Sequence, residues 1–360
     1  MAIPAPATPS LYGLTKSNSN KDFSKVYAWG KNQFNNAFPV ALSCYVHTKG
    51  IEPVYLKLDK DKKVSKGRVS VTDVFGLPPL SEELFFAFES DFTPYRVMVN
   101  NSLARIDLVT SNIRSTQNLH PFEIKLTALP DNTTANLTDE KYGSEIVVRP
   151  DSILYLALSI AKIYRNDRTE LRGYLEPIYG KSGIDWTEFS EVRPLVKDLT
   201  SAVNALLEAR IEQQSPFMIQ PVWKTERKTL HLHDNCFDVF VWSDFAFTRL
   251  FIDSISGDHE KISRRMRTIV WLSRMLYDYA VNGKIDYRQV IDSYTYDTKN
   301  DKAFSIQGIL TNPYMACEEL TRPRISKFEI KNIILGGGEK FLSPERRLDA
   351  AILATPELFT

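Results

Sequence analysis

The sequence predicts an α/β protein in which layers of helices enclose a central mixed sheet, an α/β/α sandwich. Apolar and polar residues alternate with a period of two in segments 104–110 and 121–127, which is typical of half-buried strands. Segment 151–164 instead carries apolar residues such as Ile153 and Ile160 at helical spacing, as expected of a helix that covers a sheet. Strands followed by a covering helix are the order that such a sandwich requires.

The N-terminal part is expected to begin as a loose arm. Residues 1–20 are rich in proline, serine and asparagine and have no apolar face. A helix is expected at about 38–47. Strands at 54–58 and 68–71 are then expected on either side of a strongly charged turn.

A helix at 81–91 is the next expected element. Ser81 is a favourable N-cap residue, and the two glutamates that follow it complement the positive end of a helix. Phe85, Phe86 and Phe88 would anchor this helix in the core. Later expected elements are a strand at 145–149, a helix at 189–213, a strand at 216–224, an aromatic core or dimer-interface segment at 236–251 and a helix at 258–281.

Three charged residues stand out in the alternating strands. The period of two places Glu123 and Lys125 on one face of their strand and Ile124 on the other. If the two strands pair as a hairpin across a loop at 111–120, Asp107 can approach Glu123. Two carboxylates supply the hard oxygen ligands that suit Mg²⁺, and an adjacent lysine can orient or deprotonate a water molecule. The trio therefore favours metal-dependent phosphodiester hydrolysis.

A purely structural interpretation of the same letters stays open. Glu-x-Lys on a strand is also typical of a solvated, ion-paired face, and residues 328–331 repeat the letters Phe-Glu-Ile-Lys. Asp107 favours a site, because it lies in an otherwise apolar strand where an unpaired carboxylate would be costly. The second copy has no such partner, since Asp301 is the nearest aspartate upstream of it.

Asp107 followed by Glu-Ile-Lys at 123–125 resembles the PD-(D/E)xK nuclease core, with Ile106 in place of the eponymous proline. The longer run Phe-Glu-Ile-Lys-Leu-Thr-Ala-Leu-Pro-Asp-Asn at 122–132 resembles the HindVP-type type II restriction endonucleases more specifically. Further matches to that family are Trp-Gly-Lys-Asn-Gln-Phe-Asn at 29–35 and Glu-Ser-Asp-Phe at 89–92.

The resemblance implies a type II restriction endonuclease that uses Mg²⁺ to cut double-stranded DNA at a palindromic site, GRCGYC in that family. It implies that Asp107, Glu123 and the backbone carbonyl of Ile124 hold the metal, and that Lys125 serves the attacking water. Glu89 matches the further acid that such nucleases place on the helix before the catalytic strands. A palindromic site is matched by a two-fold homodimer. The resemblance further implies products with 5′-phosphate ends and a cognate DNA methyltransferase acting on the same site, with no direct contact implied.

Amide and basic side chains are candidates for contacts with DNA. Asparagine and glutamine can bond adenine in a bidentate manner, and lysine and arginine can reach guanine or phosphate. A polar loop and a solvated helix face are the ordinary alternatives for these residues. The candidates are Lys31, Asn32, Gln33, Arg264, Arg265, Arg267, Arg346 and Arg347.

The composition is that of an ordinary soluble globular protein, with 43% hydrophobic and 25% charged residues. A net charge of +1 favours neither presence nor absence of nucleic-acid binding, so DNA contacts would need local basic faces. We expect an arm at 1–20, a nuclease core at 21–228 and a C-terminal part at 229–360. That last part would pack on the core and contribute to DNA recognition or dimerisation.

Nothing in the sequence points to secretion or a membrane. The three cysteines lie far apart without metal-ligand spacing, which favours a reducing compartment. The N-terminus is no secretory signal, and the longest apolar stretch, 153–161, is too short to span a bilayer. The sequence also gives little support for a zinc site, because no third ligand is spaced to join His231 and His233. The expectation is a cytoplasmic bacterial protein.

Two other functions stay open at this point. One is a repair or recombination nuclease with the same core, which would give smeared or structure-dependent cuts instead of discrete ones. The other is a DNA-binding protein with a degenerate nuclease fold, which would bind DNA without cutting it. The intact set of Asp107, Glu123 and Lys125 argues against the second alternative.

Overall fold

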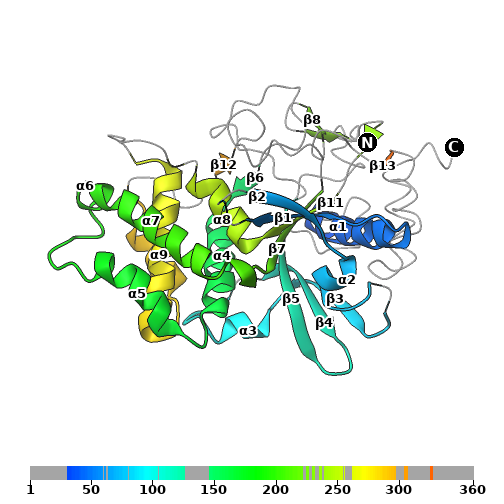
Figure 1. Ribbon diagram of the computed structural model, residues 1–360, viewed down its shortest axis with the longest axis horizontal. Helices are drawn as coiled ribbons and strands as arrows, with labels where there is room; N and C mark the ends of the chain where they lie inside the picture. The colour runs from blue at the N-terminus through cyan, green and yellow to red at the C-terminus, as the bar shows by residue number, and fades with distance from the viewer. Residues whose placement is uncertain are drawn as a thin grey trace, which may run out of the picture.

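The computed structural model describes residues 31–125 and 146–296, apart from 60, 62–63, 80, 104, 222–223, 227–228, 232–234, 237–238, 254 and 256–261, together with 304–306 and 325–326. Within these residues a mixed α/β protein is built around one large sheet (Figure 1). The expected α/β class is therefore confirmed.

The large sheet has seven strands in the order β2-β1-β11-β7-β5-β4-β3. It is mixed, because β1 pairs with β11 and β5 pairs with β7 in parallel, whereas the other neighbours are antiparallel. The strands are β1 (Val54–Leu58), β2 (Val64–Arg68), β3 (Leu84–Ser90), β4 (Ile106–Asn112), β5 (Gln117–Ile124), β7 (Pro216–Pro221) and β11 (Val239–Ser243).

In the described part of the chain, three short two-stranded sheets lie outside the large one. The strand predicted at 145–149 is β6, and it pairs with β12 instead of joining the large sheet. The pairs are β6 (Ile146–Val148) with β12 (Phe304–Ile306), β8 (Lys224–Glu226) with β9 (Thr229–His231), and β10 (Asn235–Cys236) with β13 (Ile325–Ser326).

Helices cover the centre of the sheet. All five residues of β11 are buried, which requires protein against both faces of the strand. Helix α1 (Lys31–Thr48) contacts β3, β5, β7 and β11, and α8 (Asp244–Ile252) contacts β1, β7 and β11. The aromatic segment predicted at 236–251 as core thus forms β11 and α8, and the prediction of a core there is confirmed.

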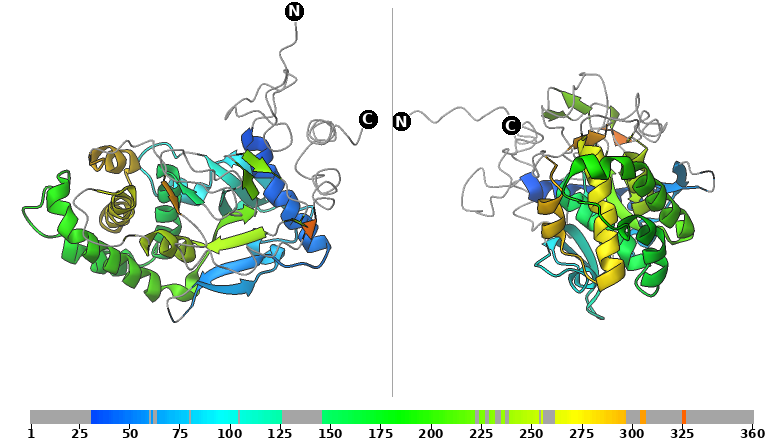
Figure 2. Two further views of the ribbon diagram at one scale, coloured as in Figure 1. Left: turned by 90° about the horizontal axis from the view of Figure 1, so that it is seen from above. Right: turned by 90° about the vertical axis from the view of Figure 1, so that its left-hand side faces the viewer.

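A second group of helices packs beside the sheet. Helix α4 contacts α8 and α9, and α9 contacts α5 and α7. Seen from above, the green and yellow helices of this group gather at one end of the molecule, away from the blue N-terminal elements (Figure 2). The helices are α4 (Pro150–Ile163), α5 (Arg168–Tyr179), α6 (Phe189–Val192), α7 (Val196–Ala209), α9 (Arg264–Asn282) and α10 (Tyr287–Ser293). None of the described helices is long and apolar enough to cross a bilayer.

The prediction of a helix at 81–91 is wrong. The segment is strand β3, which pairs antiparallel with β4 from Leu84 opposite Asn112 to Ser90 opposite Ile106. Leu84 and Phe86 are buried whereas Phe85 is 53% exposed, so the segment alternates as a strand does. Aromatic residues fit this half-buried surface better than a helix, and the Ser81 hydroxyl accepts from Glu83 N–H in a turn instead of capping a helix.

Two further boundaries differ from the sequence prediction. The strand expected at 68–71 ends at Arg68, because Ser70 caps the short helix α2 (Val71–Phe75) by accepting from the backbone N–H of Asp73. The single helix expected at 189–213 is interrupted by a 3₁₀ turn at Arg193–Leu195. Pro194 lies in that turn and has no N–H for a helical hydrogen bond. Helix α5 was not predicted at all.

A buried carboxyl group joins α8 to α4. Asp244 is fully buried, and its Oδ2 accepts a hydrogen bond of 2.7 Å from the Ser159 hydroxyl. Its Oδ1 accepts from the backbone N–H groups of Phe245 at 2.8 Å and Ser215 at 3.3 Å. Burial nevertheless raises the pKa of Asp244 to about 7, because desolvation outweighs the hydrogen bonds that lower it.

This raised pKa predicts that stability falls as the pH rises from about 4 to about 7. In that window the unfolded chain has released the proton of Asp244 whereas the folded protein still holds it, at roughly 1.4 kcal/mol for each unit of pKa difference. Asp244→Asn removes the titrating group. The unfolding free energy of the variant, measured with urea, should therefore rise relative to wild type across the window and level off above it. A constant difference at all pH values would contradict the prediction.

Candidate active site

Hairpin β4–β5 brings two carboxylates together. Both strands reach further into the connecting loop than predicted, and their ladder sets Leu108 opposite Phe122. Extended by one residue, this register would set Asp107 opposite Glu123. Residues opposite each other in an antiparallel pair share one face of the sheet and lie about 5 Å apart at Cβ. The Asp107 carboxylate also accepts a hydrogen bond of 2.8 Å from the backbone N–H of Ile124. The hairpin predicted from the sequence is confirmed, and it juxtaposes these acids.

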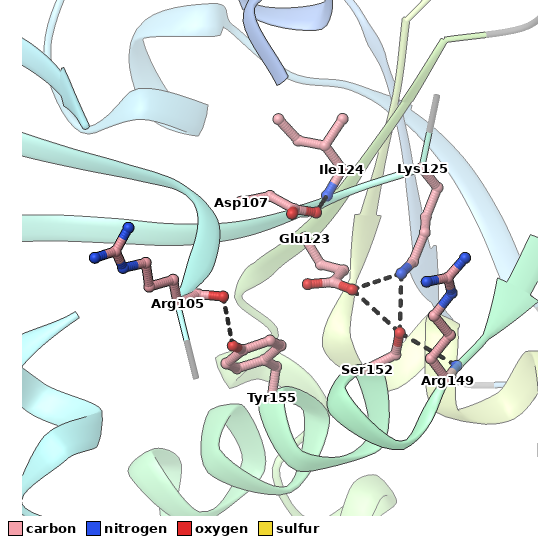
Figure 3. A network of polar contacts seen from close by, with 8 residues as sticks. All are labelled: Arg105, Asp107, Glu123, Ile124, Lys125, Arg149, Ser152 and Tyr155. Carbon is pink, nitrogen blue, oxygen red and sulfur yellow. Dashed lines mark hydrogen bonds and ion pairs between the residues drawn. The ribbon is translucent and has the colours of Figure 1, made fainter. Parts of the chain in front are cut away.

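Lys125 completes the cluster from the same strand. Its Nζ lies 2.5 Å from Glu123 Oε1 and donates a second hydrogen bond of 2.9 Å to the hydroxyl of Ser152 on α4. That hydroxyl in turn donates to Glu123 Oε1 at 3.1 Å. Figure 3 shows the triangle of hydrogen bonds that joins Glu123, Lys125 and Ser152, with the Asp107 carboxylate next to it on strand β4. The buried pair is thus hydrogen-bonded to a third group.

The cluster is largely shielded from solvent. Glu123 and Lys125 are 8% and 9% exposed, Ser152 is fully buried and Asp107 is half-buried. An ion pair in such a place is retained only where further hydrogen bonds compensate the loss of water. Among the described residues, both hydrogen bonds to Glu123 reach Oε1, so Oε2 stays available for another ligand.

Helix α4 begins at the site. Pro150 occupies its first turn, where a missing N–H costs nothing and the fixed φ suits the helix. The pKa of the next residue, Asp151, is raised by desolvation and then by the negative charge of Glu123, while Lys125 and Arg149 oppose the shift. The helix start therefore adds a third carboxylate within electrostatic reach of Glu123.

Tyr155, one turn further along α4, links the helix to β4. Its hydroxyl donates a hydrogen bond of 2.7 Å to the backbone carbonyl of Arg105. Burial raises the pKa of Tyr155, and the negative charges of Glu123, Asp151 and Asp107 raise it further. All three acids thus lie within electrostatic reach of this hydroxyl.

Two arginines border the acidic cluster. Arg105 and Arg149 are exposed, and neither guanidinium forms an ion pair within the part of the chain that the structure describes. Figure 3 shows them on either side of the carboxylates.

The sequence did not single out Arg105 and Arg149 as site residues, nor Asp151, Ser152 and Tyr155. The run Arg-Pro-Asp-Ser at 149–152 carried a usable signal, since proline and aspartate mark a helix start directly after a strand.

The other candidate residues lie apart from the trio or outside the described structure. Arg264 and Arg265 begin α9 and are half-buried, and desolvation lowers the pKa of Arg265. Arg267 is only 1% exposed, and its guanidinium lies 4.3 Å from the ring centre of Trp271, so it belongs to the core. The sequence prediction that it contacts DNA is therefore wrong. The first turn of α1 contains Lys31, Asn32 and Gln33, and β3 contains Glu89, whose side chains are not among those described. Arg346, Arg347, His233 and the second Phe-Glu-Ile-Lys copy at 328–331 lie outside the described residues.

The donor set fits a hard divalent cation. Asp107 and Glu123 offer carboxylate oxygens, and Glu123 Oε2 has no hydrogen bond from a described residue. In the described ranges no three histidine, cysteine or acidic side chains form a complete metal-binding group. A cation here would therefore take most of its ligands from water and substrate, which is how Mg²⁺ commonly binds to proteins.

Comparison with known proteins identifies the family. The sequence profile of the HindVP restriction endonuclease family matches residues 29–359. Type II restriction enzyme HgiDI of Herpetosiphon aurantiacus is 47% identical over 352 residues, which cover 98% of this chain and 97% of that enzyme. The probable type II restriction enzyme HindVP of Haemophilus influenzae is 43% identical over 353 residues, covering 98% and 95%. No solved structure matches. These similarities extend over nearly the whole chain, which therefore belongs to the HindVP family of type II restriction endonucleases.

Proposed function

We propose that this restriction endonuclease hydrolyses phosphodiesters of double-stranded DNA with Mg²⁺ held at the β4–β5 hairpin. Asp107, Glu123 and the backbone carbonyl of Ile124 would hold the ion, and Lys125 would serve the water molecule. The observation that carries this proposal is the buried Glu123–Lys125 ion pair, with the Asp107 carboxylate hydrogen-bonded to the backbone N–H of Ile124 between them. Such a pair is costly to bury, so chemistry is a better reason for it than stability.

Each residue of the trio has a distinct task. Glu123 would hold the ion through Oε2, because its Oε1 is held by Lys125 and Ser152. Asp107 presents the opposing carboxylate. Lys125 would donate to the attacking water or to a phosphate oxygen through the N–H group that Glu123 and Ser152 leave unused. When bound, the cation neutralises charge on the phosphate and lowers the pKa of a coordinated water molecule. Attack at phosphorus in line with the 3′ oxygen gives 5′-phosphate and 3′-hydroxyl ends.

The finer features of the proposal rest on family resemblance. They are a PD-(D/E)xK fold, cleavage at GRCGYC, a homodimer in which each subunit cuts one strand, and a methyltransferase that modifies the same site. Glu89 remains a proposed further metal ligand. Lys31, Asn32, Gln33, Arg264, Arg265, Arg346 and Arg347 remain proposed DNA contacts, and Arg267 is omitted from this set because it is buried.

A plasmid digest with and without Mg²⁺, followed by sequencing of the fragment ends, tests the proposed function. We expect discrete fragments that appear only with the divalent ion and carry 5′ phosphates. Smeared or junction-dependent cutting would instead support the repair or recombination nuclease. A protein that retards DNA in a gel yet never cuts it with Mg²⁺ or Mn²⁺ would establish the degenerate DNA-binding alternative.

A further inference from the structure

We infer that Ser152 is a positioning residue of the nuclease site, which fixes the Glu123 carboxylate so that Oε2 faces the divalent cation. The inference rests on the proposed function, because it concerns the same site. Ser152 does not touch the reacting atoms itself. It acts through Glu123 and Lys125, and its position is set by the first turn of α4.

The hydrogen bonds of Ser152 leave its hydroxyl fully used. A serine hydroxyl has one hydrogen to donate and two lone pairs to accept with. In this structure it donates to Glu123 Oε1 at 3.1 Å and accepts from Lys125 Nζ at 2.9 Å. The backbone N–H of Arg149 approaches the same oxygen at 3.5 Å. The hydroxyl is fully buried, so water cannot replace any of these partners without a change in packing.

This arrangement decides which oxygen of Glu123 is free. The terminal torsion of a glutamate side chain is broad, so the carboxylate can rotate unless its oxygens are held. Here Oε1 receives both Lys125 and Ser152, and the plane of the carboxylate is fixed by two donors from different directions. Without the hydroxyl, Lys125 is the sole donor left among the described residues, and the carboxylate can turn either oxygen to the ammonium. The metal ion and the Lys125 ammonium would then compete for the carboxylate oxygens of Glu123.

The location of Ser152 makes it suitable for this task. It lies on a 14-residue helix that packs on α8 and α9, so the hydroxyl is carried by a rigid element and not by a loop. The chain also offers a matched control on the same helix. Ser159 is 4% exposed and likewise donates to a carboxylate, that of Asp244, whose described side-chain hydrogen bonds involve Ser159, Ser215 and Phe245 and no member of the trio.

Ser152→Ala tests the inference, with Ser159→Ala as the control for the loss of a buried hydroxyl. Mn²⁺ binding to the full-length protein is measured by titration calorimetry, and Mg²⁺ is titrated in a plasmid cleavage assay. Loss of a group that orients a metal ligand typically lowers metal affinity by about 10- to 100-fold. We expect this loss in Ser152→Ala, with a matching rise in the Mg²⁺ concentration for half-maximal cleavage. Ser152→Thr should restore affinity to within about threefold of wild type, since the hydroxyl is kept.

Ser152→Cys covers the case in which the alanine variant does not fold. The thiol fills nearly the same space but is a weak donor, so Ser152→Cys should behave like Ser152→Ala. The inference is overturned if folded Ser152→Ala or Ser152→Cys binds Mn²⁺ as tightly as wild type. An equal loss of affinity in Ser159→Ala would overturn it too, because the effect would then be one of general packing.

Glu123→Gln separates this inference from the proposed function. One outcome is that Glu123→Gln no longer binds Mn²⁺ whereas Ser152→Ala binds it as tightly as wild type. The proposed metal site is then supported, and the positioning role of Ser152 is wrong. If Glu123→Gln binds Mn²⁺ and cuts DNA as wild type does, the proposed site itself is wrong.

Discussion

Replacing Asp107 with asparagine is expected to abolish DNA cleavage while leaving DNA binding in Ca²⁺ within a few fold of wild type. The amide can still accept the hydrogen bond from Ile124 N–H, so the hairpin keeps its geometry. The negative charge that faces Glu123 is lost, and with it several kcal/mol of transition-state stabilisation that a bound cation supplies. At about 1.4 kcal/mol per factor of ten, the rate should fall by roughly a thousandfold or more.

Single-turnover cleavage and a gel-shift assay in Ca²⁺ measure the two effects separately. Asp107→Ala should also lose cleavage, with an added cost in stability because Ile124 N–H then loses its side-chain acceptor. Glu329→Ala, in the second Phe-Glu-Ile-Lys copy, is the control and should cut normally. An inactive Glu329 variant together with an active Asp107→Asn would contradict the assignment, because the catalytic site would then lie in the second copy of the motif.

Removal of the Lys125 ammonium should have the largest effect on stability as well as on catalysis. Lys125→Met keeps most of the volume of the side chain but leaves the buried Glu123 carboxylate without its cation. Breaking one side of a buried ion pair typically costs about 3–5 kcal/mol, because an uncompensated charge stays behind. Cleavage should be lost too, since no ammonium remains beside the attacking water.

The double variant Glu123→Gln with Lys125→Met distinguishes charge from packing. Removing both charges leaves no unpaired ion, so the double variant should be more stable than Lys125→Met alone. Urea unfolding at neutral pH measures the difference, and neither variant should cut DNA. If Lys125→Met matches wild type in unfolding free energy, or if the double variant is the less stable of the two, the pair is not a coupled buried ion pair.

The β4–β5 hairpin could be predicted from the sequence because strand alternation is a local signal. Asp107 and Glu123 each lie inside a run of alternating apolar residues, and a one-residue change of register would have sent every side chain to the other face. The structure has the predicted pairing. Helix α4 could also be predicted, because apolar residues such as Ile153 and Ile160 recur at helical spacing. In the structure ten consecutive residues of this helix, Ser152 to Ala161, are buried.

Other features could not be predicted, because they depend on contacts far along the chain. Segment 81–91 carries a helix start signal at Ser81, yet pairing with β4 makes it a strand, so tertiary structure overrides local preference. Arg267 looks like part of a basic surface until Trp271 and the rest of the core cover it. Ser152 is 29 residues from Glu123, and no local pattern reveals the hydrogen bond between them.

The most direct test of the metal site is a crystal structure of the enzyme with a DNA duplex and Mn²⁺, recorded at a wavelength where manganese scatters anomalously. We predict an anomalous peak bound by one oxygen of Asp107 and by Oε2 of Glu123, at about the 2.1 Å typical of a small hard cation, with Lys125 Nζ beside it. A peak at any other group of residues, with the two carboxylates bound to no ion in a complex that cuts DNA, would contradict this assignment.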